Sequence, residues 1–111
     1  MSLKDEVLIV LKDTNRGKGT APTYVSAYQI LNRLDTASQH QLATNFGNPG
    51  KGGGMHFSMA SKVAQVCLDL VADGEAELVY MDTEDVRYVV ESQPGIPIEP
   101  GYKVCALYRA I

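Results

Sequence analysis

The sequence predicts one α+β domain, in which three main helices are followed by a β-hairpin and an extra C-terminal strand. Two observations predict this order. Apolar residues recur at helical spacing in the first two thirds of the chain, and short β-prone runs separated by turn residues follow. With 111 residues, 45% of them apolar and 21% charged, the chain has the size and composition of a globular domain with one core.

The first helix is expected over residues 3–12. Leu8 and Ile9 widen its apolar stripe, which consists of Leu3, Val7, Val10 and Leu11. Glycines, a proline and polar turn formers between 13 and 22 then take the chain out of the helix.

The second helix is expected over residues 24–34, with Thr23 as its N-cap. Its predicted core residues are Val25, Tyr28, Ile30, Leu31 and Leu34. Residues 35–46 are compatible with a short polar helix that holds Leu42 and Phe46 against the body. Five glycines and a proline at 47–54 predict a flexible loop, because glycine loses the most backbone entropy on ordering.

The third helix, over residues 58–72, has the clearest amphipathic pattern. Its apolar face consists of Met59, Val63, Val66, Cys67, Leu70 and Val71. Its polar face consists of Ser58, Ser61, Lys62, Gln65 and Asp69. Gly74 is expected to end this helix.

Two β-prone runs, 76–81 and 86–91, are separated by four polar residues and predict a hairpin. A last strand at 102–109 would cover a sheet edge or offer one to a partner chain. Cys67 and Cys105 are flanked by apolar residues and are expected to be buried thiols.

Four segments carry a resemblance to a known class: TYVSAYQI (23–30), ASKV (60–63), LVADGEAELV (70–79) and VRYV (86–89). Their order of extended piece, helices and hairpin resembles the winged-helix class of DNA-binding domains over residues 3–91. The resemblance implies that the third helix binds DNA and that the hairpin is the wing. The chain departs from this class in its long link at 35–57, its extra strand, and an acidic wing tip at Asp82, Glu84 and Asp85.

Charge is distributed unevenly along the chain, although the net charge is only −3. Residues 14–68 hold five basic residues against one acidic residue, a local charge of +4, and the remaining five basic and twelve acidic residues give −7. This asymmetry is typical of a domain with one basic face. The charged N-terminus and the lack of a long apolar run favour a cytoplasmic protein with no membrane partner.

Catalytic and metal-site motifs are incomplete. The glycine-rich loop has Asn45 and Gly52 where a P-loop needs a glycine and a hydroxyl residue, and His40 and His56 lack further zinc ligands. Asp69 and Asp73 are one helical turn apart, as solvated carboxylates often are, and the tyrosines fall mostly within apolar runs. We therefore expect no enzymatic activity, no metal and no cofactor.

The sequence leaves two functions open. In the first, a homodimeric transcriptional regulator or mobile-element accessory protein binds double-stranded DNA. The third helix would read bases through Ser58, Ser61, Lys62 and Gln65, and phosphates would be held by Arg16, Lys18, Arg33 and Lys51. In the second, the same fold is a protein-interaction module whose C-terminal strand or apolar surface pairs with another chain. Basic residues gathered beside the third helix would favour DNA, and scattered ones would favour the interaction module.

Overall fold

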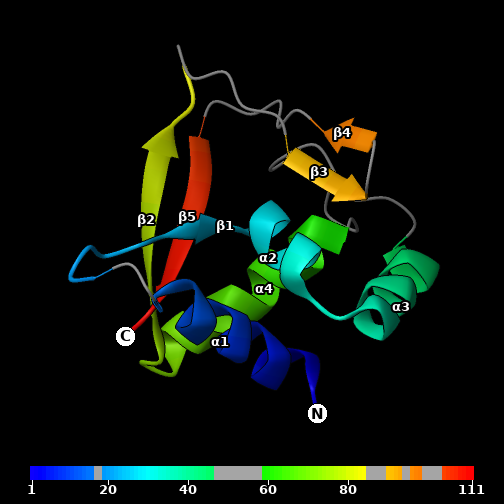
Figure 1. Ribbon diagram of the computed structural model, residues 1–111, viewed down its shortest axis with the longest axis horizontal. Coiled ribbons are helices and arrows are strands. Elements are labelled where there is room, and N and C mark those ends of the chain that lie inside the picture. Colours follow the sequence, from blue (N-terminus) through cyan, green and yellow to red (C-terminus); the bar gives the residue numbers. More distant parts are fainter. Residues whose placement is uncertain (17–18, 47–58, 85–89, 94–95, 99–103) are drawn as a thin grey trace.

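The computed structural model describes residues 1–16, 19–46, 59–84, 90–93, 96–98 and 104–111 (Figure 1). Its helices are α1 (Leu3–Thr14), α2 (Ala27–Arg33), α3 (Thr36–Phe46) and α4 (Met59–Ala72). Its strands are β1 (Val25–Ser26), β2 (Ala76–Asp82), β3 (Val90–Gln93), β4 (Ile96–Ile98) and β5 (Val104–Ala110). The protein is therefore of mixed α+β class, as the sequence predicts. The glycine-rich segment 47–54 lies outside the described residues.

The main sheet is antiparallel, with three strands in the order β1-β5-β2. β2 pairs with β5 along its full length, from Ala76 opposite Ala110 to Asp82 opposite Val104, whereas residues 86–89 of the predicted hairpin lie outside the described residues. Within 86–91, Val90 and Glu91 belong to β3, which pairs with β4 in a second, two-stranded sheet. The C-terminal strand is thus the central strand of the main sheet rather than an edge.

One hydrophobic core lies between the helices and the inner face of this sheet. Its fully buried side chains come from α1, α2 and α4: Val7, Leu11, Ile30, Leu31, Val63, Cys67 and Leu70. The apolar stripe predicted for the first helix is correct at Val7, Val10 and Leu11, whereas Ile9 is 43% exposed. Alternation in the strands places Ala76, Tyr108 and Ala110 on the inner face, where each is buried.

The second helix begins later than predicted. Residues 25–26 form β1, and Ser26 rather than Thr23 is the N-cap of α2. The Ser26 hydroxyl accepts from the backbone N–H of Gln29, and the Gln29 side chain accepts from the backbone N–H of Ser26. This reciprocal pair is a capping box, which satisfies two backbone donors at the start of the helix.

The link between the second and third predicted helices contains a full helix, α3. Asp35 accepts a hydrogen bond from the backbone N–H of Ser38, and Glu6 of α1 accepts from Ser38 Oγ and from the backbone N–H of Asp35. The Gln39 side-chain amide donates to carbonyls at the end of α2. Residues on three helices therefore fix the start of α3, and Leu42 holds it on the core with 5% of its surface exposed.

The short strand β3 lies outside the main sheet and packs against α2 (Figure 1). At the end of α4, Gly74 has φ +78°, and the backbone N–H groups of Gly74 and Glu75 donate to Val71 and Leu70. This is the glycine-terminated helix end that the sequence predicts at Gly74.

Candidate functional site

The outward side of α4 carries the polar residues predicted to bind DNA. α4 packs against α1, α2 and β2 through its apolar face, so its opposite side points away from these elements. Gln65 is exposed on that side, and Ser61 and Lys62 are half-buried. Ser58 lies outside the described residues.

Leu68 is an apolar residue on this outward side that the sequence interpretation missed. It is 50% exposed and lies about two turns from Ser61 and one turn from Gln65 on the helix surface. The sequence contains a signal for this exposed residue, because Leu68 follows Ser61 by seven residues and therefore falls on the polar stripe of the helix. The surface is therefore a polar face with a central apolar side chain.

Charge along α4 changes sign from its beginning to its end. Lys62 lies in the first turn, whereas Asp69 is exposed near the end and Asp73 follows the helix. Lys4 of α1 forms an ion pair with Asp73, and this carboxylate raises the pKa of the Lys4 ammonium. A polyanion such as DNA would therefore be attracted to the N-terminal half of α4 and repelled by Asp69.

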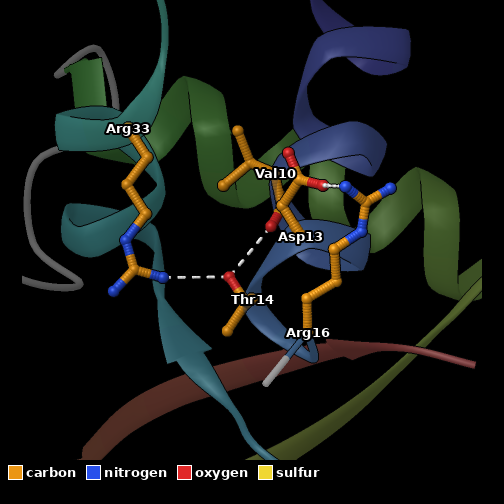
Figure 2. A pocket seen from close by; sticks show the side chains of 5 residues that line it. All are labelled: Val10, Asp13, Thr14, Arg16 and Arg33. Carbon is orange, nitrogen blue, oxygen red and sulfur yellow. Dashed lines mark hydrogen bonds and ion pairs between the residues drawn. The ribbon is translucent and has the colours of Figure 1, made fainter. Parts of the chain in front are cut away.

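Arg16 and Arg33 line one open pocket of about 400 Å³ between α1 and α2 (Figure 2). The other lining residues are Val10, Asp13 and Thr14 of α1. Arg33 Nη1 donates to Thr14 Oγ1 at 2.9 Å, and Thr14 Oγ1 in turn donates to the Val10 carbonyl at 2.8 Å. Arg16 Nη1 lies 3.3 Å from Asp13 Oδ1, in an ion pair in which both side chains are well exposed.

The predicted DNA-binding residues therefore fall on two separate surfaces. α4 runs behind the pocket in Figure 2 and contributes none of its described lining residues. Gln65 is exposed and Lys62 is half-buried on α4, and neither is among the described side chains of α1 and α2 that form the pocket. Lys18 and Lys51 lie outside the described residues. Among the basic residues that are described, no common face includes both arginines and the outward side of α4.

Models of known protein families, curated proteins and solved structures were compared with the chain, and none matches it.

A polar cluster on the outer face of the sheet joins β2, β5 and the residue that precedes β1. Glu77 Oε1 accepts hydrogen bonds from Arg109 Nη1 at 2.5 Å and from Tyr24 Oη at 3.1 Å. The strand register explains this cluster, because Glu77 of β2 lies directly opposite Arg109 of β5 and β1 pairs with the other side of β5. The hydrogen bond from Arg109 is the main cause of the lowered pKa of Glu77, and the hydrogen bond from Tyr24 is the second. Burial is the main cause of the raised pKa of Tyr24, and its hydrogen bond to Glu77 is the second. Sequence reasoning missed this cluster because it depends on strand order.

The two cysteines are free thiols and are buried, as predicted. Cys67 has no exposed surface, and burial raises the pKa of its thiol to about 12. A thiol at this pKa is protonated at neutral pH and is a poor nucleophile or metal ligand. In the described part of the chain, no group of three or more histidine, cysteine, aspartate or glutamate side chains could hold a metal ion. None of the described helices is both long and apolar enough to cross a membrane.

Proposed function

We propose that this protein is a winged-helix-like domain that binds double-stranded DNA with modest affinity through the outward side of α4. The observation that carries the proposal is the strand order β1-β5-β2, with α4 leading into the edge strand β2. In a winged helix, the helix before the β-hairpin enters the major groove. The polar outward side of α4 is in the corresponding position here.

Residue roles follow from the chemistry of this surface. Gln65 is exposed and its amide can donate to and accept from adenine, and Lys62 can contact a phosphate or a guanine. Ser58 and Ser61 would add hydroxyl contacts. Lys18 and Lys51 keep their predicted role as phosphate contacts. Arg16 and Arg33 are left out of this interface, because the pocket that they line does not include α4.

The charge of α4 limits the expected affinity. Three lysine contacts, Lys18, Lys51 and Lys62, would give a slope of about −3 for log affinity against log salt concentration. Asp69 on the same helix, Asp82 at the end of β2 and Glu84 after it would oppose closer approach of the duplex.

Fluorescence anisotropy with random and selected duplexes, from low to physiological salt, tests the proposal. Lys62→Gln should make the slope shallower by about one for every sequence, whereas Gln65→Ala should leave the slope unchanged and relax preference at one base pair by about 1 to 3 kcal/mol. Arg16→Gln is the charge-matched control and should leave duplex affinity at its original value within a factor of two. Absence of binding at low salt would eliminate the proposal.

A protein-interaction module is the second candidate, favoured by two specific observations. Leu68 is half exposed at the centre of the outward side of α4, and the described basic residues are divided between two surfaces. The version of this hypothesis in which the C-terminal strand pairs with a partner chain is wrong, because β5 already has a partner strand on each side. The contact would instead form through α4, and a second copy of the chain is the simplest partner.

Sedimentation velocity separates this candidate from the first. If α4 is a dimer contact, Leu68→Lys should convert dimer to monomer at the same protein concentration, whereas Ile9→Lys, which changes a comparably exposed residue of α1, should not. A chain that is monomeric at all concentrations and binds DNA would exclude the homodimer.

A further inference from the structure

We propose that the pocket between α1 and α2 binds a small ligand with a phosphate or carboxylate group, with Arg33 as the main contact and Arg16 as the second. This site is independent of the DNA interface proposed for α4. The proposal depends on the way in which Arg33 is held in place and on the net charge of the lining residues.

Arg33 is positioned by a neutral hydroxyl rather than by a carboxylate of the side chains that the structure describes. Its Nη1 is fixed by the hydroxyl of Thr14, a neutral acceptor on a residue that is only 6% exposed. None of the carboxylates in the described part of the chain lies within ion-pair distance of Arg33. A guanidinium has five N–H donors in a planar fork, so most of its donors stay available for a planar oxyanion.

Thr14 is itself fixed, since its hydroxyl donates to the Val10 carbonyl one turn earlier in α1. The hydroxyl proton is thus used in the bond to Val10, and the hydroxyl oxygen accepts from the guanidinium (Figure 2). This chain of two hydrogen bonds connects the end of α2 to the body of α1. A positioned cationic group of this kind lowers the entropy cost of ligand binding.

The pocket has the charge and size for such a ligand. Two arginines and one aspartate leave one net positive charge among the lining residues that are described. Asp13 pairs with Arg16 in an exposed and therefore weak contact, which an oxyanion can replace. A volume of about 400 Å³ admits a molecule of metabolite size, and Val10 offers an apolar wall for its non-polar part.

A titration of the full ¹⁵N-labelled chain tests the proposal by NMR. Inorganic phosphate is the first probe and malonate the second, each compared with sodium chloride at equal ionic strength. A short DNA duplex is a third arm, because its backbone offers the same phosphate chemistry. We expect saturable shifts confined to the amides of residues 13–16 and 33, caused by phosphate or malonate and not by chloride.

Substitutions of single residues test whether the amide shifts arise from binding in the pocket. Arg33→Gln should weaken binding at least tenfold, and Arg33→Lys should weaken it less, because lysine keeps the charge but loses the planar fork. Asp13→Asn should tighten binding a few-fold, since it removes the competing carboxylate. Lys12→Gln is the control for net charge, because Lys12 is exposed on α1 and does not line the pocket.

Several outcomes would overturn the proposal. Shifts that spread over the whole surface, fail to saturate, or occur equally with chloride would mean screening rather than binding. If Arg33→Gln and Lys12→Gln change anion binding equally, Arg33 is not part of the binding site. Shifts caused by the duplex alone would make these arginines part of a DNA contact. If Arg33→Gln does not give a folded spectrum, Arg16→Gln replaces it, because the Arg16 side chain is well exposed and its described ion pair is with an exposed carboxylate.

Discussion

Glu77 illustrates how one residue acquires its role from neighbours that are distant in sequence. It accepts hydrogen bonds from Arg109 and Tyr24, which lie 32 and 53 positions away. Each contact is weak in energy because the carboxylate is on the surface. Together they hold the outer face of the three strands in one register.

The lowered pKa of Glu77 gives the protein a defined response to acid. Because Arg109 and Tyr24 favour the carboxylate, folded Glu77 has a lower pKa than the ordinary value of 4.5. Its contribution to stability is therefore complete above pH 4.5 and is lost as the pH falls through the folded pKa. Chemical denaturation between pH 7 and 3 should show a smaller loss of stability for Glu77→Gln than for the original protein. Parallel curves for the two proteins would contradict this.

Leu70 is a fully buried residue of α4, with 0% of its surface exposed. Truncation to alanine removes packed methyl groups and leaves a cavity, so Leu70→Ala should lower the free energy of unfolding by about 2 to 5 kcal/mol. Leu68→Ala, two residues earlier and 50% exposed, is the matched control and should cost far less. Urea denaturation measures both values, and equal effects would mean that the orientation of α4 is wrong.

At the scale of single elements, hydrogen bonds at the helix ends decide boundaries that the apolar pattern leaves open. Both Thr23 and Ser26 are N-cap residue types, and only Ser26 has a glutamine three positions later. Thr23 instead donates its hydroxyl to the Ala21 carbonyl in the preceding loop. The capping box was thus present in the sequence, and the two β1 residues were mistaken for helix.

Alanine substitutions separate the two caps. Ser26→Ala removes the acceptor for the Gln29 N–H and should cost about 1 kcal/mol, within the range of 0.5 to 2 kcal/mol for lost N-caps. Thr23→Ala should change stability by less than about 0.5 kcal/mol, as surface substitutions usually do. Thermal unfolding measures both, and the reverse order would move the start of α2 back to residue 24.

At the scale of the whole molecule, β5 connects the end of the chain to its beginning. It lies between β1 and β2, and its inner side chains Tyr108 and Ala110 belong to the core that α1, α2 and α4 form. Burial raises the pKa of the Tyr108 hydroxyl, as expected of a phenol inside this core. Without β5, the edges of β1 and β2 would lose their hydrogen-bond partners.

A truncation tests the importance of this strand. A chain of residues 1–103 should fail to fold, with loss of the cooperative unfolding transition and of the far-ultraviolet circular dichroism of the native protein. Removal of Ile111 alone, which is 73% exposed and follows β5, should leave both unchanged. A folded 1–103 chain would show that β5 is an addition to a domain that is complete without it.

Much of the fold could be predicted, and the candidate sites could be predicted only in part. Helical periodicity located α1 and α4 because their apolar faces are long and regular. It predicted the exposure of Gln65 on α4, whereas Lys62 is half-buried. Helical periodicity could not predict the hydrogen bond between Arg33 and Thr14, because these residues are 19 positions apart on different helices.

The sequence by itself determined the helices, the glycine that ends α4, the buried thiols and the α+β class, because each of these depends on residues within a few turns of one another. Tertiary structure alone decided which strands pair and which charges meet. A β-strand satisfies its backbone donors only on another strand, and its residue pattern does not identify that partner. For this reason the residue pattern favours the nearest β-prone run as the partner of β2, whereas β5 occupies the position between β1 and β2.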